Sequence, residues 1–309
     1  MRVLVTGGHG FLGSALCPQL RLDGFEVMAP KHTECDLRYA PMVDLCFSKN
    51  DPDVVVHLAA NVGGIGKNKR LPASLAYDNL LMGINVIHSC KMYRVRKLVV
   101  LGTICSYPKF CDVPFKEEDF WKGYPEETNA PYGIAKKALL VTGQAYRQQH
   151  AMNIVHLLMV NLYGPRDNFD LEDSHVIPAL IRKFHEAKEK ERPVVHLWGD
   201  GTPTREFLFV RDAAKAISAA VRRYDSGEPI NIGNGQEVSI LELAEQIKAI
   251  TDYKGEIVWD TSKPNGQPRR CLDVSKAESF LGWTAETTLR DGLEETYSWW
   301  LDKGREPLR

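Results

Sequence analysis

The chain has 309 residues, of which 44% are hydrophobic and 26% charged, and its formal net charge is -1. These values are ordinary for a globular protein with one large core or two domains that share a cleft. The balanced charge gives no reason to expect a nucleic-acid partner. No apolar run approaches the ~18 residues of a membrane span, and the seven cysteines follow no metal-ligand spacing. We therefore expect no membrane association, no metal, and a cytoplasmic protein with reduced thiols.

The N-terminus predicts a dinucleotide-binding turn. The apolar run 3–5 is typical of a buried parallel strand, and residues 14–22 are typical of a helix. Between them lies Thr-Gly-Gly-His-Gly-Phe-Leu-Gly, with glycines at 7, 10 and 13. Glycines at this spacing allow a tight turn, close approach to a pyrophosphate, and close packing of helix on strand. The helix N-terminus then favours the phosphate charge.

The second strand, expected at 26–29, bears on the choice of cofactor. NAD enzymes of this kind usually carry an acidic residue near its end for the ribose 2′-hydroxyl. Here Lys31 and His32 follow the strand, and both could meet a 2′-phosphate. The sequence therefore favours NADP, with NAD as the alternative. Asp36 and Leu37, slightly further on, are expected at the adenine edge.

Apolar strands then alternate with helices. Strands are expected at 53–60, 97–102 and 153–161, and a helix at 76–93. Such alternation is typical of a parallel doubly wound sheet, in which ligands bind at the carboxyl ends of strands. Beyond residue 163 the alternation breaks. We predict an α/β fold: a Rossmann domain and a smaller, interleaved α/β substrate domain. The expected bounds are 1–162 with a returning segment at about 207–232, and 163–206 with 233–309.

Tyr132 and Lys136 lie four residues apart in a run of good helix formers. Positions i and i+4 share one helix face, so both side chains are expected in the same space. A nearby ammonium favours the phenolate, which predicts a tyrosine pKa below the usual value of about 10. Thr103 and Cys105 follow the strand at 97–102, where ligands bind, and are further site candidates. Alone, this spacing also fits an ordinary surface helix.

With these residues the chain resembles the extended short-chain dehydrogenase/reductases. Within them it is most similar to the GDP-L-fucose synthases, the GDP-4-keto-6-deoxymannose 3,5-epimerase-4-reductases. The resemblance covers essentially the whole chain, and the run Ser-His-Val-Ile-Pro-Ala-Leu-Ile-Arg-Lys-Phe-His is its most specific part. The runs that carry it are 6–13, 62–65, 107–109, 161–165, 174–185 and 259–264.

The resemblance implies roles for five residues. Tyr132 would protonate the C4 oxygen as NADPH delivers hydride to C4, and Lys136 would hold the nicotinamide ribose and tune Tyr132. Thr103 stands where the family has a serine and keeps the hydroxyl. Cys105 and His175 match the pair assigned to epimerisation at C3 and C5.

The remaining implied contacts are with cofactor, substrate and a second subunit. Motif and resemblance place the cofactor against Gly7, Gly10, Phe11, Leu12, Gly13, Lys31, His32, Asp36, Leu37, Leu58, Ala59, Ala60, Leu101, Tyr132, Lys136, Asn161, Leu162 and His175. The nucleotide-diphosphate sugar, most simply a GDP-sugar, would contact Val62, Gly63, Lys183, Trp198, Arg205 and Asn265. The family pairs two helices, here about 76–93 and 132–150, into a four-helix bundle, which predicts a homodimer. Its apolar surface would come from Leu80, Leu81, Ile84, Val86 and Ile87.

Some positions depart from the family. His9 and His32 replace arginines near the 2′-phosphate, Lys183 replaces an arginine, and Asn265 replaces an aspartate. The run 66–70, Gly-Lys-Asn-Lys-Arg, replaces an Ala-Asn-Asn stretch, and could line a different sugar pocket.

Other functions stay open. An NAD(P)-dependent 4-epimerase or a simple 4-ketoreductase would use the same Thr103, Tyr132 and Lys136. A dehydratase needs an added acid where Ile104 stands. A non-catalytic dinucleotide sensor would not need the intact Tyr132 and Lys136.

Overall fold

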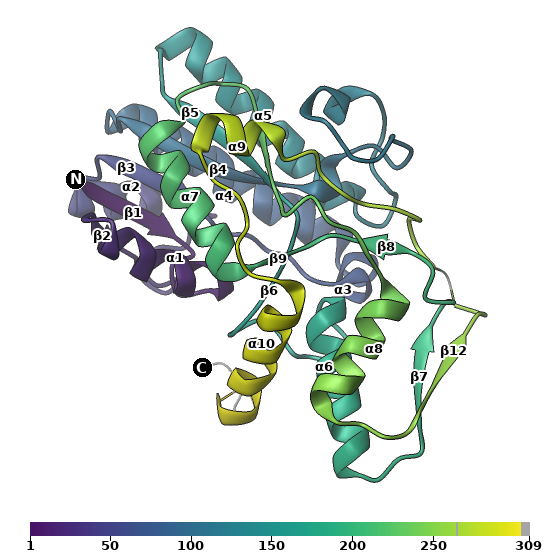
Figure 1. Ribbon diagram of the computed structural model, residues 1–309. Coiled ribbons are helices and arrows are strands. Elements are labelled where there is room, and N and C mark those ends of the chain that lie inside the picture. The colour runs from purple at the N-terminus through teal and green to yellow at the C-terminus, as the bar shows by residue number, and fades with distance from the viewer. Residues whose placement is uncertain (264, 304–309) are drawn as a thin grey trace.

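The computed structural model describes residues 1–263 and 265–303 (Figure 1). Pro264, in the run 259–264, and residues 304–309, at the end of the expected substrate domain, lie outside this range. In chain order the elements are β1 (Arg2–Thr6), α1 (Phe11–Leu22), β2 (Glu26–Met28), α2 (Ala40–Asn50), β3 (Val54–His57), α3 (Ile65–Arg70), α4 (Pro72–Met92), β4 (Lys97–Thr103), η1 (Ile104–Ser106), η2 (Glu117–Trp121), α5 (Ala130–His150), β5 (Ile154–Met159), β6 (Asn161–Tyr163), α6 (Val176–Glu189), β7 (Val194–Trp198), β8 (Thr204–Arg205), β9 (Phe207–Phe209), α7 (Val210–Arg223), β10 (Ile230–Ile232), β11 (Val238–Ser239), α8 (Ile240–Thr251), β12 (Glu256–Asp260), α9 (Ser275–Leu281) and α10 (Leu289–Lys303).

A six-stranded parallel sheet, in the order β10-β5-β4-β3-β1-β2, forms the larger part of the molecule. Its central strands β3, β4 and β5 are runs of Val, Leu and Ile that are buried almost throughout, as parallel strands covered on both faces must be. Strand order reverses between β1 and β3, and ligands bind in the crevice outside such a reversal. The predicted doubly wound Rossmann fold is confirmed.

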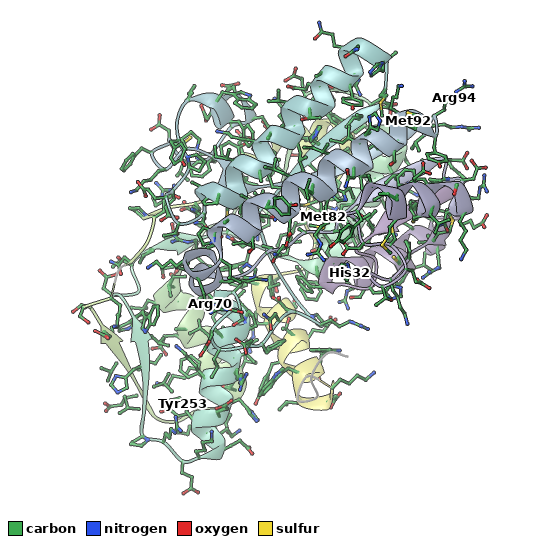
Figure 2. All side chains as sticks on the ribbon, turned by 180° about the vertical axis from the view of Figure 1, so that it is seen from behind. His32, Arg70, Met82, Met92, Arg94 and Tyr253 are labelled. Carbon is green, nitrogen blue, oxygen red and sulfur yellow. The ribbon has the colours of Figure 1, made fainter. Side chains whose placement is uncertain are left out.

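Helices cover both faces of this sheet (Figures 1 and 2). Helices α1, α7 and α9 share one apolar core with the sheet, and α2, α4 and α5 share another with its opposite face. Helices α4 and α5 lie side by side along most of their length. The segment from β4 to the start of α5, which carries the expected catalytic residues, therefore lies where the sheet meets the helix pair α4–α5.

A smaller part is built from α6, α8 and α10 with the strand pair β7–β12, at the lower right of Figure 1. Its core centres on the fully buried Phe184. The strand β10 returns to the large sheet, and β6 pairs with β9. Leu272, Leu281 and Trp283, expected in the substrate domain, pack instead in the larger core. The domain bounds stay a prediction.

Several local expectations differ from the structure. Residues 66–70, expected as a loop, belong to helix α3, because the buried Asn68 amide donates to the carbonyls of Gly63 (2.8 Å) and Gly64 (3.0 Å). Beyond residue 163, where the alternation was expected to break, the short strands β8 and β9 follow one another and β9 runs directly into α7. Helices α2 and α7 were not predicted. Within residues 1–263 and 265–303, none of the helices has both the length and the apolar character to cross a bilayer.

Candidate active site

The β1–α1 turn has the geometry of a dinucleotide-binding loop. Gly7 has a φ of +72°, and a Cβ there would lie 2.8 Å from the backbone nitrogen of Ala59, so only glycine fits without strain. The Gly10 N–H donates to the Gly7 carbonyl at 3.0 Å and closes the turn. Helix α1 begins at Phe11, three residues earlier than predicted, so its N-terminus opens directly at the turn.

A cavity of about 180 Å³ lies against this turn. Six predicted cofactor residues line it together: Gly7, Gly10, Lys31, His32, Leu37 and Ala59. Its other lining residues are Thr6, His9, Pro30, Cys35 and Met82; His32 and Met82 are labelled in Figure 2. The exposed Lys31, His32 and His9 bring basic groups to the end of β2, where His32 Nε2 lies 3.6 Å from the Asp36 carboxylate and His9 Nε2 lies 2.8 Å from the Ala29 carbonyl oxygen. This donor set fits a 2′-phosphate.

Asp36 is oriented differently from the expectation. Its carboxylate accepts two hydrogen bonds from the Arg38 guanidinium, at 3.0 and 2.7 Å, and Arg38 lowers its pKa to about 2. Because this carboxylate is engaged by Arg38, a contact with adenine stays a prediction. Leu37 is buried beside it and lines the cavity.

The other predicted cofactor residues lie at the carboxyl edge of the sheet. Phe11, Leu12 and Gly13 form the first turn of α1, and Leu58 and Ala60 follow β3. The Leu101 side chain is buried in the core, so a ligand could contact only the backbone of this residue. In β6 the Asn161 amide donates to the Glu206 carbonyl at 3.0 Å, with Leu162 next to it.

Tyr132 and Lys136 lie on the face of α5 that packs on the sheet. Lys136 Nζ is 5.9 Å from the centre of the Tyr132 ring, and the side chains are 4% and 9% exposed for Lys136 and Tyr132. The predicted lowering of the tyrosine pKa is wrong for this structure. Burial, followed by the nearby Cys105, raises the pKa of Tyr132, and burial lowers the pKa of Lys136 to about 8. Tyr132 is thus a proton donor at neutral pH.

A buried histidine that sequence reasoning missed lies near this pair. His57 ends β3, and its Nδ1 is 2.8 Å from Thr6 Oγ1. Burial, and then the charge of Lys136, lower its pKa to about 3, so the ring is neutral. The sequence did carry a signal for this residue, because a polar His57 directly follows three valines of a strand that is expected to be buried.

Cys105 is held close to Tyr132 by the packing of η1 on α5. A Cβ at Gly133 would lie 2.5 Å from the Cys105 carbonyl oxygen, so only glycine allows this approach. The Ser106 hydroxyl also donates to the Gly133 carbonyl at 2.8 Å. Thr103 Oγ1, at the end of β4, accepts a bond from the Cys105 N–H at 3.2 Å. The structure therefore brings together Thr103, Cys105, Tyr132 and Lys136.

Two arginines from the C-terminal half of the chain lie near the thiol. Arg270 Nη1 lies 3.6 Å from Cys105 Sγ and donates to it, and Arg270 was not predicted as a site residue. Burial, and then the charge of Arg270, lower the pKa of the predicted Arg205 to about 10. A Cβ on Gly266 would lie 3.5 Å from Arg205 Nη2, which places Asn265 nearby.

His175 precedes α6 and lies next to the predicted Val62–Gly63 loop. The Gly64 N–H donates to the Asp173 carbonyl at 2.8 Å, and Arg70, labelled in Figure 2, bonds the Asp173 carboxylate at 2.8 Å. His175 is solvent-exposed, yet desolvation by the surrounding protein lowers its pKa. Among the described residues, no hydrogen bond joins His175 to Cys105 or Tyr132.

The remaining predicted substrate residues lie on the smaller part. Trp198 ends β7 with 66% of its surface exposed, and the Lys263 ammonium is 5.9 Å from its ring. Asn265 Oδ1 accepts a bond from the Asp200 N–H at 3.0 Å, two residues beyond Trp198. Lys183 is half-buried on α6, and burial lowers its pKa. No described contact joins Lys183 to Trp198, Arg205 or Asn265.

Comparison with known proteins identifies the class. Residues 3–233 match the NAD-dependent epimerase/dehydratase family, and the chain belongs to this family. A curated relative, GDP-L-fucose synthase 1 of Arabidopsis thaliana, is 46% identical over 301 residues, which cover 97% of this chain and 93% of the relative. The resemblance to extended short-chain dehydrogenase/reductases and to GDP-L-fucose synthases is confirmed.

Solved structures agree with this assignment. A GDP-L-fucose synthetase from Naegleria fowleri bound to NADP has a TM-score of 0.91 at 29% identity, covering 98% of this chain and 94% of that one. A GDP-6-OMe-4-keto-L-xylo-heptose reductase from C. jejuni has a TM-score of 0.92 at 31% identity, covering 98% of both chains. Both neighbours share the fold of this chain over nearly its whole length.

Proposed function

We propose that this chain is a GDP-sugar 3,5-epimerase and 4-ketoreductase that uses NADPH. The observation that carries the proposal is the grouping of Cys105 with Tyr132 and Lys136, in a chain that is 46% identical to a GDP-L-fucose synthase. The substrate is a GDP-4-keto-6-deoxy-mannose-like sugar. NADP(H) is the cofactor, as in the Naegleria fowleri relative.

The cofactor would be held by the β1–α1 turn and by the cavity beside it. Gly7 and Gly10 leave the backbone open to the pyrophosphate, and Lys31 and His32 would meet the 2′-phosphate. When bound, NADPH supplies the hydride for C4. Lys136, which is protonated below a pKa of about 8, would hold the nicotinamide ribose.

Tyr132 acts as the general acid of the reduction. Burial keeps the phenol protonated at neutral pH, so it can donate its proton to the C4 oxygen. Thr103 lies at the end of β4 on the same side and orients the C4 oxygen through its hydroxyl. The buried neutral His57 adds no second positive charge near Lys136.

Cys105 and His175 carry the epimerisation. The C4 ketone makes the C3 and C5 protons acidic. The Cys105 thiolate removes one of these protons and becomes a thiol, while the electron pair moves to the C4 oxygen to form an enolate. His175 returns a proton to the opposite face of that carbon. Cys105 lies in η1 and His175 directly precedes α6, so removal and return of the proton are assigned to residues from separate segments of the chain.

The nucleotide half of the substrate would lie along the smaller part of the molecule. The exposed Trp198 ring offers a stacking face, and Arg205 offers positive charge to the diphosphate. Asn265 would present its amide to the base or the sugar from the neighbouring loop.

A simple 4-ketoreductase is the second candidate, because the neighbour from C. jejuni at TM-score 0.92 is named as a reductase. It would use Tyr132 and Lys136 in the same way and leave Cys105 without a chemical role.

We also propose a homodimer built on α4 and α5. A groove of about 290 Å³ between these helices is lined by Ala76, Leu80, Ile134 and neighbouring apolar residues. Tyr77 and Ile84 on α4 and Ile134 and Val141 on α5 are each spaced by seven residues and exposed. Val86 and Ile87, expected at the interface, are instead buried in the core under α4, so they do not supply its surface.

Turnover tests the proposed function. We expect the protein to oxidise NADPH when GDP-4-keto-6-deoxy-mannose is added. The oxidation is measured as the loss of NADPH absorbance. The matching dTDP- and UDP-4-keto sugars serve as controls for the base. No NADPH oxidation with any of these three substrates would contradict the proposal.

A further inference from the structure

Arg270 contacts the sulfur that the proposed epimerisation uses as its base. Its Nη1 donates to Cys105 Sγ at 3.6 Å, from a segment 165 residues further along the chain. Resting on the proposed function, we propose that Arg270 is a positioning residue that stabilises the Cys105 thiolate and aims its sulfur for proton removal from the sugar.

The Arg270 guanidinium is fixed by its surroundings. Its Nε donates to Gln267 Oε1 at 2.6 Å, and the Gln267 amide in turn donates to the Lys109 carbonyl at 2.8 Å. Arg270 and Gln267 are 8% and 7% exposed. Behind them, the buried Glu206 carboxylate accepts the Leu272 N–H at 2.7 Å, which ties this segment to the strand region that carries Arg205. Because the guanidinium is fixed in this way, its hydrogen bond holds the Cys105 sulfur in one orientation.

Two cationic side chains lie near the Cys105 sulfur. Within residues 1–263 and 265–303, no carboxylate forms an ion pair with Arg270, and Arg205 is a second, half-buried cation near it. The titratable groups that face the thiol are Arg270, Arg205 and the protonated Tyr132. The Glu126 carboxylate accepts hydrogen bonds from Thr128 and Asn129 rather than from Arg270, and these bonds, followed by the charge of Arg270, lower the pKa of Glu126. A thiolate between two cations relieves their mutual repulsion.

This arrangement meets a requirement of the chemistry. The thiolate, not the thiol, accepts a proton from carbon, and an unperturbed cysteine with a pKa of about 8.5 is only a few per cent thiolate at pH 7. A cation at hydrogen-bond distance increases that fraction. Arginine suits the task because it stays charged throughout the working pH range. Arg270 is therefore placed to support the thiolate that removes the proton from carbon.

Alkylation of Cys105 by iodoacetamide measures its thiolate directly. The protein is treated with limiting reagent from pH 5 to 10, and the Cys105 peptide is quantified by mass spectrometry, which separates it from the other half-buried thiol, Cys111. We expect Arg270→Gln to move the midpoint of the rate profile upward by at least about one pH unit, the effect typical of losing an adjacent opposite charge. At pH 7 this lowers the alkylation rate about tenfold.

Two further variants make the test specific. Arg270→Lys keeps the positive charge but not the planar guanidinium with its paired N–H donors. The midpoint of its alkylation profile is expected to stay within about half a pH unit of wild type. Arg269→Gln is the matched control: the neighbouring arginine is exposed, pairs with Glu237, and does not touch the thiol, so the midpoint should not move. If Arg270→Gln does not fold, Gln267→Leu frees the guanidinium and should raise the midpoint by about half a unit.

An unchanged midpoint in folded Arg270→Gln, or in Gln267→Leu where the first variant does not fold, overturns the inference. A shift of equal size in Arg269→Gln also overturns it. The midpoint would then depend on the overall positive charge nearby and not on the contact between Arg270 and Cys105. The readout needs no sugar substrate. Failure of the wild type to epimerise would therefore refute the proposed function, while the alkylation profile still decides the role of Arg270.

Discussion

Replacing Lys136 by methionine is expected to abolish reduction and to make the folded protein more stable. The Lys136 side chain is 4% exposed, and burial lowers its pKa from 10.5 to about 8. That difference corresponds to about 3 kcal/mol of destabilisation while the group is charged, since one pKa unit is worth about 1.4 kcal/mol. Loss of the contact with the Tyr132 ring offsets about 0.5–1 kcal/mol. We expect a net gain of about 2–3 kcal/mol at pH 7.

The gain must depend on pH with a definite sign. Below pH 8 Lys136 is protonated in both the folded and the unfolded chain, so its full cost is present. Between pH 8 and 10.5 the unfolded chain binds more protons, so the wild type gains stability as pH rises. Above 10.5 both forms are neutral and the cost is gone. The advantage of Lys136→Met should therefore shrink with rising pH.

Thermal unfolding at pH 7 and pH 9.5 measures this. For 309 residues the unfolding entropy is about 0.65 kcal/mol/K, which predicts an increase in Tm of about 4 °C at pH 7 and less than about 2 °C at pH 9.5. Lys91→Met, at an exposed position on α4, is the control and should change little at either pH. A lower Tm for Lys136→Met at pH 7, or a gain that grows with pH, would refute the reasoning.

Three further outcomes are expected. NADPH should bind more tightly than NADH in titrations, because Lys31 and His32 follow β2; equal or tighter binding of NADH would contradict this. Tyr132→Phe should lower reduction at least about 100-fold in a stopped-flow assay while NADPH affinity is kept, because the ring still packs but no proton is supplied; wild-type turnover would remove Tyr132 from the mechanism. The protein should sediment as a dimer at micromolar concentration and Ile84→Glu as a monomer, because Ile84 is 43% exposed on the apolar face of α4; a monomeric wild type would exclude the dimer.

Local patterns in the sequence were sufficient to predict the frame of the fold. The Val- and Leu-rich strands, the glycine turn and the spacing of Tyr132 and Lys136 depend on residues close in sequence, and the structure has all of them. Helix α7 was missed although its sequence carries a clear amphipathic pattern, with buried Ala, Ile and Val on one face and charged residues such as Arg211 and Lys215 on the other.

Other features depend on contacts between distant segments. The raised pKa of Tyr132 follows from burial, which the helix spacing does not report. Arg270 reaches Cys105 only after the segment near Leu272 is tied to Glu206. The partner of His57 could not be predicted for the same reason, since the contact between His57 and Thr6 requires β1 and β3 to pair.

Deuterium incorporation tests the central claim most directly. Wild type, Tyr132→Phe and Cys105→Ser are incubated with GDP-4-keto-6-deoxy-mannose and NADPH in D₂O, and the recovered sugars are examined by NMR. We predict deuterium at C3 and C5 of an inverted, reduced product from wild type, and the same exchange without reduction from Tyr132→Phe. In Cys105→Ser exchange should be greatly slowed, because an alcohol is a much poorer base than a thiolate. Exchange and epimerisation at the wild-type rate in Cys105→Ser, or a wild-type product reduced at C4 without deuterium at C3 and C5, would contradict the account.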